Sequence, residues 1–179
     1  MKGYTIEYFS SLDEEDHDRE MYALFGYCVY NIQILEHQLM NMILVYYKSK
    51  NINLDENEYS TLFVNYSDKT MGNLIEKVIK LYPIDENIKE ELWLIHKKRN
   101  FFIHHYFKNR NIKRASKKGK IEIIEEINEF DNLVIDIDKY LTDTTKPYIE
   151  KLGITEQNFI DEMKKIMNGI FIDEYNFPE

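Results

Sequence analysis

Three side chains within six residues, Arg99, Asn100 and His104, form the set in this sequence that is best suited to chemistry on a phosphate. A guanidinium can bind a phosphate group and stabilise the charge that develops on its oxygens. An imidazole can remove or return a proton near neutral pH. With the 2′-hydroxyl of RNA as nucleophile, this set suffices for metal-free cleavage to a cyclic phosphate. DNA lacks that hydroxyl and would not be cut in this way.

Arg99 is unusual both in its position and in its type. The segment from Leu92 to Phe107 has no Pro or Gly, and its apolar residues recur every three or four positions, which predicts a helix. Arg99 lies in the middle of the apolar arc of that helix, where a guanidinium is costly unless it is paired or faces a cleft. The chain has four arginines against nineteen lysines, so an arginine here indicates a need for a planar fork of donors. The arc consists of Leu92, Ile95, Phe102, Ile103, Tyr106 and Phe107.

The helix does not bring these groups together by itself. Asn100 and His104 lie one turn apart, whereas Arg99 points about 140° away from His104. A single copy could converge on a phosphate only through long side chains that reach inward, and two copies facing each other across a dimer seam would converge more easily. His96 is expected to face the packed side and His105 the solvent, both in structural roles.

A long segment without proline, residues 19–50, predicts the first major helix. It is apolar nearly all round, as expected for a helix that is central in its bundle or shared with a second subunit. For a chain of this length we favour sharing, which predicts a homodimer. Gln33 and Glu36 are polar exceptions on one apolar face. Glu36 is either satisfied by a local partner or placed against Arg99 or His104, and both residues are candidates to support the site.

Basic residues are concentrated in one stretch. Residues 97–120 contain ten Lys or Arg and no Asp or Glu, whereas the rest of the chain has 13 basic and 32 acidic residues. Such an island can hold a polyanion although the formal net charge is −9. The alternative is a solvated loop that happens to be basic. The candidate RNA-binding residues are Lys97, Lys98, Arg110, Lys113, Arg114, Lys117 and Lys118.

The other segments predict a single domain over residues 1–179. Residues 1–18 are expected to form an arm that docks aromatic side chains, and 51–67 a connecting loop. Ser67 or Asp68 is expected to cap a helix over 70–79, in which Gly72 packs closely against a neighbour.

Further along the chain, Pro83 is expected to stop that helix, and Asp85 to cap the next, which runs to about residue 109. Residues 110–120 are predicted to be a basic loop, 121–145 an amphipathic helix interrupted by Pro147, and 155–169 a last helix capped by Thr155. Residues 171–179 form a tail.

Composition favours an all-α bundle of about four to six helices, because six Gly and three Pro leave little turn chemistry for a β fold. The single Cys28, in an apolar helix, suits a reducing compartment and is a poor candidate for a nucleophile. We find no membrane span and no signal peptide, which predicts a cytoplasmic protein. Without a glycine-rich phosphate loop, a thiolate site or a His-Glu-x-x-His motif, we expect no cofactor and no metal.

The stretch Arg99-Asn100-Phe101-Phe102-Ile103-His104 resembles the Arg, polar residue, further residues, His motif of HEPN domains. The resemblance implies an all-α, commonly dimeric protein and metal-independent endoribonuclease activity in toxin–antitoxin, antiphage or RNA-processing systems. It implies that Arg99 positions the phosphate, His104 acts as general base or acid, and Asn100 orients the pair. Extended by Tyr106, the motif also looks like that of HEPN toxins paired with a nucleotidyltransferase-type antitoxin, in which this tyrosine is modified. The alternative role for Tyr106 is that of a core residue.

Two functions are therefore expected. The first is a homodimeric endoribonuclease with a toxin or defence role and RNA as substrate. The second is a non-catalytic HEPN-like module that binds a nucleotide, RNA or a protein partner through the same cleft, with charges in 113–120 contributing. A third option is a helical protein in which Arg99 only bridges to Glu36.

Overall fold

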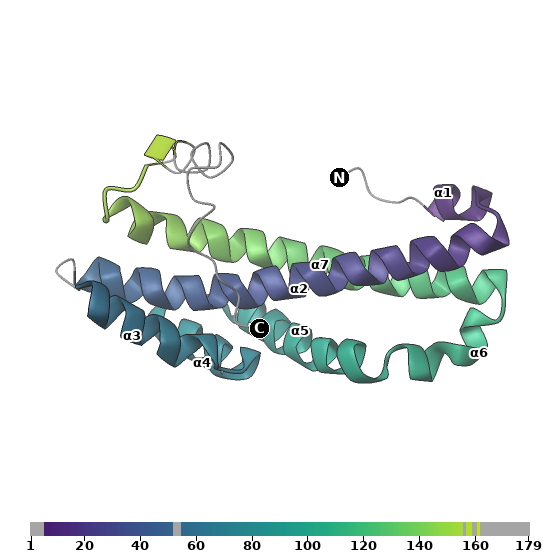
Figure 1. Cartoon of the computed structure of the whole chain (residues 1–179), viewed down its shortest axis with the longest axis horizontal. Helices are drawn as coiled ribbons and strands as arrows, with labels where there is room; N and C mark the ends of the chain where they lie inside the picture. Colours follow the sequence, from purple (N-terminus) through teal and green to yellow (C-terminus); the bar gives the residue numbers. More distant parts are fainter. Residues whose placement is uncertain (1–5, 52–54, 156, 159–160, 162–179) are drawn as a thin grey trace, which may run out of the picture.

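The computed structural model describes residues 6–51, 55–155, 157–158 and 161, and over these residues the fold is all-α without strands (Figure 1). The predicted all-α bundle is confirmed. In chain order the helices are α1 (Ile6–Ser11), α2 (Glu14–Lys50), α3 (Glu56–Ser67), α4 (Met71–Leu81), α5 (Glu86–His105), the 3-10 helix η1 (Phe107–Arg110), α6 (Asn111–Arg114) and α7 (Lys117–Glu150).

The two longest helices, α2 and α7, lie side by side and run in the same direction along the molecule (Figure 1). Residues later in α2 contact residues later in α7, so the two helices are parallel. The helix α5 runs the opposite way beside them, and α3 and α4 cover one end of the bundle (Figure 1). The contacts between α2 and α7 include Asp18–Lys120 at 3.1 Å, Asn31–Asp131 at 2.7 Å and the rings of Tyr46 and Tyr148 at 5.7 Å.

An aromatic cluster fastens the C-terminal half of α5 to the bundle. The ring centroid of Phe102 lies 4.2 Å from that of Tyr106, 4.7 Å from Phe130 on α7 and 5.8 Å from Phe25 on α2. The predicted inward face of α5 is thus largely confirmed. Ile103 is the exception, because its side chain is 40% exposed.

The prediction of a loop over residues 51–67 was wrong. The structure has helix α3 here, which buries none of its residues fully and whose Leu62 and Tyr66 pack against the core. Its start is fixed by a capping box, since the Asp55 carboxylate accepts from the Glu58 N–H at 2.8 Å and Glu58 accepts from the Asp55 N–H at 3.1 Å. The spacing Asp-x-x-Glu of a capping box is present in the sequence, but the polar residues around it favoured the prediction of a loop.

The predicted basic loop over residues 110–120 was also wrong, because the structure has η1, α6 and the first turn of α7 here. Ser116 caps α7 through its hydroxyl, which accepts from the Gly119 N–H at 3.1 Å. Gly119 allows a close approach, since a Cβ at this position would collide with the carbonyl group of Lys113. The glycine is therefore required by packing against the preceding turn and not by a flexible loop.

Pro147 does not interrupt the last long helix, contrary to expectation. The helix continues to Glu150. A proline removes one helical donor, and aromatic packing holds the turn in place, because the Tyr148 ring lies 4.6 Å from Tyr82 and 5.7 Å from Tyr46.

At the N-terminus the predicted arm is partly helical, as α1 and the start of α2, and its Phe9 is fully buried. Thr70, and not Ser67 or Asp68, caps α4. The predicted close packing of Gly72 is confirmed, because a Cβ there would lie 3.4 Å from Nε2 of His96. The Thr155 hydroxyl accepts from the Asn158 N–H at 3.2 Å, as expected of a cap. The rest of that helix and the tail at 171–179 lie outside the described residues.

A buried carboxyl group joins α2 to α7. Asp131 is 5% exposed and accepts a hydrogen bond from the Asn31 amide at 2.7 Å. Burial raises the pKa of Asp131 above its usual value, although hydrogen bonds from Asn31 and Cys28 act in the opposite direction. The ionised form therefore costs stability, and the free energy of unfolding should fall as the pH rises from the unfolded pKa to the folded one.

We expect Asp131→Asn to raise the free energy of unfolding at pH 7 by roughly 1 kcal/mol, because it keeps the acceptor for Asn31 and removes the buried charge. Urea unfolding at pH 4 to 8 measures the free energy of unfolding. In the wild type this free energy should fall as the pH rises through the acid end of the range, and in the variant this fall should be absent. Asp136→Asn, which removes the same charge from an exposed position of α7, is the matched control. A loss of stability in Asp131→Asn alone would show that the ionised carboxylate is needed.

Candidate functional site

Arg99 lies on the inward side of α5, as predicted, and its partners come from α2 and from its own helix. Its Nε lies 3.1 Å from Oε1 of Glu36, and Nη1 donates to Oδ1 of Asn100 at 3.2 Å. The side chains of Arg99 and Glu36 are 31% and 25% exposed. Of the two positions considered for Glu36, the structure has the one against Arg99.

The contact between Arg99 and Glu36 is incomplete as a hydrogen bond. Nε of Arg99 and Oε1 of Glu36 are both buried atoms, and neither has an aligned hydrogen bond among the described residues. The two atoms attract each other as an ion pair at 3.1 Å. Buried polar atoms usually find well-aligned partners. Arg99 Nε and Glu36 Oε1 are exceptions to this rule.

Arg99 lines an open pocket of about 320 Å³ between α2, α4 and α5. The start of α4 forms part of its wall, and Thr70 caps this helix by accepting from the Asn73 N–H at 3.4 Å. Free N–H groups and the positive end of the dipole at a helix start favour an anion. The pocket is lined by Glu36, Lys69, Thr70, Met71, His96, Arg99 and Asn100.

The pocket contains residues that sequence reasoning missed. Lys69, Thr70 and Met71 come from the junction of α3 and α4, which no local motif connects to Arg99. His96 was expected to be structural only, but its imidazole lines the pocket, one turn before Arg99. The ring also packs edge-on against Trp93 at 5.7 Å and faces Gly72.

His104 does not line the pocket that contains Arg99 and Asn100. Its side chain is exposed near the end of α5, and its ring centroid lies 6.1 Å from that of His105. Gln33 is exposed on α2 and is likewise absent from the pocket wall. One chain therefore brings together Arg99, Asn100 and Glu36 from the predicted set, and it leaves His104 and Gln33 outside.

Tyr106 is a core residue in this structure. It is 2% exposed, and its hydroxyl lies 3.2 Å from the Ile123 carbonyl oxygen and 3.3 Å from Glu126, both of which can accept from it. Burial raises the pKa of the phenol, and the Glu126 carboxylate adds to this effect. A modifying enzyme would not reach the hydroxyl in this conformation.

Acidic residues of α7 pair with two cations of the predicted basic island, Arg110 and Lys113. Glu126 accepts from Arg110 Nε at 2.8 Å and from Lys113 Nζ at 2.9 Å, and Lys113 also lies 3.0 Å from Glu122. Burial alone would raise the pKa of Glu126, but the bonds from Lys113 and Arg110 outweigh it and lower the pKa. These two cations are therefore already neutralised within the chain.

The remaining candidate RNA-binding residues also lie away from the Arg99 pocket. Arg114 donates to the Tyr22 hydroxyl at 2.6 Å, and Lys98 lies over the Phe130 ring at 5.5 Å. Lys97, Lys117 and Lys118 are exposed. The stretch that is most basic in sequence is thus not the wall of the pocket.

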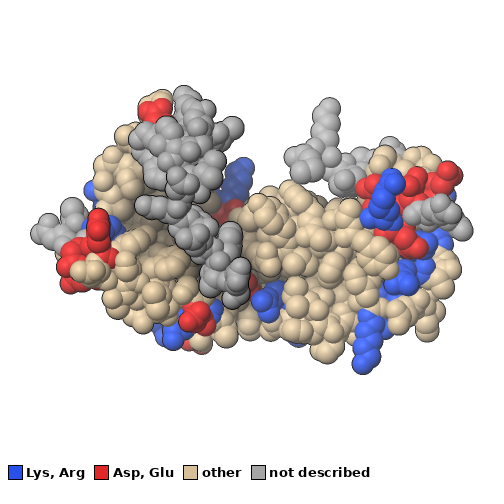
Figure 2. Space-filling model, viewed as in Figure 1, with Lys and Arg blue, Asp and Glu red and all other residues tan. Residues whose placement is uncertain are grey.

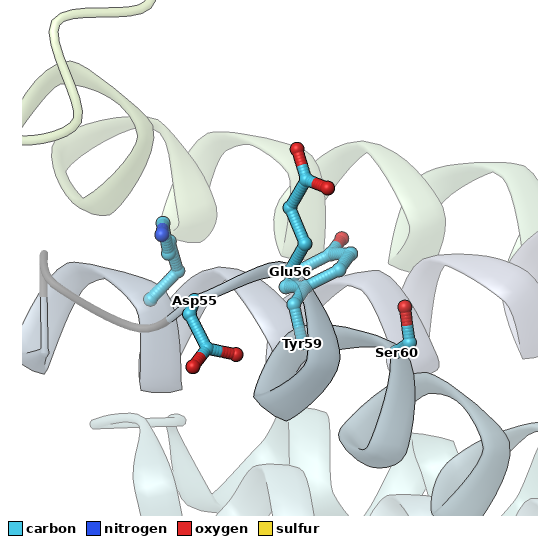
Figure 3. A pocket seen from close by; sticks show the side chains of 5 residues that line it. Asp55, Glu56, Tyr59 and Ser60 are labelled. Atoms are coloured by element: carbon cyan, nitrogen blue, oxygen red, sulfur yellow. The ribbon is translucent and has the colours of Figure 1, made fainter.

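Other groups offer less chemistry. A pocket of about 410 Å³ lies at the start of α3. Figure 3 shows that the carboxylates of Asp55 and Glu56, which line it, point in opposite directions. Asp55 already caps α3. Cys28 is fully buried, and burial, with a contribution from the Asp131 carboxylate, raises its pKa to about 12, so the thiol stays protonated. Among the described residues, no three His, Cys, Asp or Glu gather around a metal position.

None of the described helices combines the length and apolar character that a membrane span needs. No protein-family model matches the sequence, and neither a curated protein nor a solved structure matches it significantly. The site therefore has to be interpreted from its own residues.

Proposed function

We propose that the protein is a metal-independent endoribonuclease of the HEPN type, which acts as a homodimer and holds the scissile phosphate of RNA in the Arg99 pocket. The observation that carries the proposal is the partly exposed Arg99–Glu36 pair at the wall of an open pocket, whose two facing atoms are buried and poorly aligned as a hydrogen bond. Lys69 and the start of α4 line the same pocket. The set is suited to an anion with several oxygens, as a phosphodiester is.

The reaction needs no redox partner. The 2′-hydroxyl oxygen attacks the phosphorus while an imidazole accepts its proton, and the bond from phosphorus to the 5′-oxygen breaks. The leaving oxygen takes a proton from an imidazolium, and the products are a 2′,3′-cyclic phosphate and a 5′-hydroxyl. Arg99 stabilises the charge on the phosphoryl oxygens, and Asn100 holds the guanidinium in place.

An uncharged face on α2 supports self-association. Residues 21–35 contain no Asp, Glu, Lys or Arg, although 31% of the chain is charged. On this face Tyr27, Tyr30 and Ile34 are 36%, 57% and 38% exposed, and a Cβ on Gly26 would meet nothing within 4 Å. Figure 2 shows that uncharged atoms cover the middle of the molecule over α2. An exposed face of this kind is typical of a helix that packs against another subunit.

The imidazole is assigned to His104 of the second copy. Within one chain His104 lies outside the Arg99 pocket, and its exposure makes it available to another molecule. His96 competes for the role because it lines the pocket, but its ring is packed against Trp93 and Gly72 of its own chain. In the proposed dimer each Arg99 pocket lies opposite a His104 from the second copy, and twofold symmetry makes the two sites equivalent.

In EDTA, the protein should cut single-stranded RNA and leave cyclic phosphate ends, and Arg99→Ala and His104→Ala should each lower the rate by about 10²–10³-fold. Gel analysis of a labelled RNA and of DNA with the same sequence measures this, and the DNA should stay intact. Equal melting temperatures would show that the variants are folded. Cutting that both variants retain, or a strict requirement for metal, would reject the proposal.

A second candidate is a non-catalytic module that binds a nucleotide, RNA or a protein partner. The position of His104 outside the pocket favours it, since a single chain then has an anion site without that imidazole. It predicts saturable, salt-sensitive RNA binding without turnover. A toxin or defence role in the cytoplasm, with a nucleotidyltransferase-type antitoxin, belongs to the first proposal. Such a partner would have to act elsewhere than on the buried Tyr106 hydroxyl.

A further inference from the structure

Two further depressions adjoin the Arg99 pocket around the junction of α3 and α4. One, of about 250 Å³, is lined by Lys69, Asn73, Lys77 and Lys80 together with Tyr66 and Glu76. The other, of about 200 Å³, has Phe63, Tyr66 and Lys69 in its wall and shares Glu36 with the Arg99 pocket. Lys69 lines all three depressions, so they adjoin at this residue, and we call the three together the α4 groove.

The α4 groove carries three lysines, Lys69, Lys77 and Lys80, beside the acidic Glu36 and Glu76. Lys69 and Lys80 are eleven positions apart in the sequence, and with Lys77 they line one depression together with Tyr66 of α3. None of these three lysines forms an ion pair among the described residues, in contrast to Arg110 and Lys113. The hydrogen bond to Tyr47 raises the pKa of Lys77, so this side chain stays charged.

Aromatic side chains accompany these charges. Phe63 on α3 is 45% exposed and lines the branch that contains Tyr66 and Lys69. Alternation of exposed aromatic rings and cations is typical of surfaces that bind single-stranded nucleic acid, because bases stack on the rings while phosphates contact the cations. From Thr70 to Lys80 the helix extends about 15 Å, which is enough for more than one nucleotide.

We propose that the α4 groove binds the strand that flanks the scissile phosphate, and that the substrate is single-stranded RNA. Its phosphates lie along Lys69, Lys77 and Lys80, and a base stacks on Phe63. The inference rests on the proposed function for the identity of the polymer, and it adds where the strand lies. A duplex would not fit this assignment, because its base faces are stacked and cannot meet Phe63.

The test is fluorescence anisotropy of the full chain with a labelled, single-stranded 2′-O-methyl RNA, which lacks the nucleophile and so reports binding alone. The triple variant Lys69→Ala, Lys77→Ala, Lys80→Ala should bind at least about tenfold more weakly at low salt, and its slope of log K against log salt should be about 2 smaller. Phe63→Ala should weaken binding about fivefold or more and leave the slope unchanged. The matched control is the triple variant Lys108→Ala, Lys139→Ala, Lys151→Ala, which removes the same charge from exposed positions outside the groove and should change the affinity less than about twofold.

The outcomes separate the groove from the catalytic proposal. The groove proposal would be wrong if both triple variants weakened RNA binding equally, or if the protein bound duplex and single-stranded RNA with equal affinity. Groove-dependent binding without cleavage of unmodified RNA would reject the endoribonuclease and leave the groove standing. Cleavage that depends on Arg99, with affinity unaffected by the groove variants, would reject the groove and leave the enzyme standing.

Discussion

Mixing two inactive variants, Arg99→Ala and His104→Ala, should restore RNA cleavage to about a quarter of the wild-type rate. Half of the dimers in an equal mixture are mixed, and each of these holds one site with both Arg99 and His104 intact. The reason is the geometry of the single chain, in which the Arg99 pocket is not lined by His104. Initial rates on a labelled RNA, measured after the subunits have exchanged, give the restored fraction.

The matched control pairs Arg99→Ala with Asn100→Ala. Both residues belong to the pocket of one chain, so no mixed dimer of these variants contains an intact site, and the rate should not exceed that of the better single variant. His96→Ala should keep most of the activity if the imidazole comes from the second copy. An inactive His96→Ala combined with no restoration in the first mixture would show that the imidazole comes from the same chain.

The position of Arg99 could be predicted from sequence because a helix has a fixed period. A guanidinium within an apolar arc of α5 needs a partner, and Glu36 was the acid within an apolar face of the other long helix. The structure joins them at 3.1 Å. The remaining wall of the pocket could not be predicted, since Lys69 and Thr70 reach Arg99 only through the way α3 and α4 fold back on the bundle.

The charge pattern shows where linear counting fails. The basic stretch, residues 97–120, ends just before Glu122. Counting charges along the sequence therefore treats the stretch apart from the acidic residues that follow it. In the fold, α6 packs back on α7, so Glu122 and Glu126 bind Lys113 and Arg110 at 2.8 to 3.0 Å. Outside the basic stretch, Lys69, Lys77 and Lys80 line a depression at α4 together with Glu76.

Phe102→Ala should lower the free energy of unfolding by about 3–5 kcal/mol, a large part of the 5–15 kcal/mol of a typical domain. The ring is 5% exposed and contacts Phe25, Tyr106 and Phe130, so it connects three helices. Truncation removes these contacts and leaves a cavity that the bundle cannot fill without moving a helix. Urea unfolding followed by far-UV circular dichroism measures the loss.

Ile103→Ala is the matched control, because it truncates the next residue of the same helix. Its side chain is 40% exposed, so the loss should stay below about 1 kcal/mol. Equal losses at the two positions would contradict the assignment of the inward face of α5. Arg99 lies on this same face, one turn before Phe102, but its guanidinium is positioned by Glu36 and Asn100 and not by the aromatic cluster. At temperatures where Phe102→Ala is folded, its RNA cleavage per folded molecule should stay within a few-fold of wild type, since the variant removes packing and leaves every group of the pocket in place.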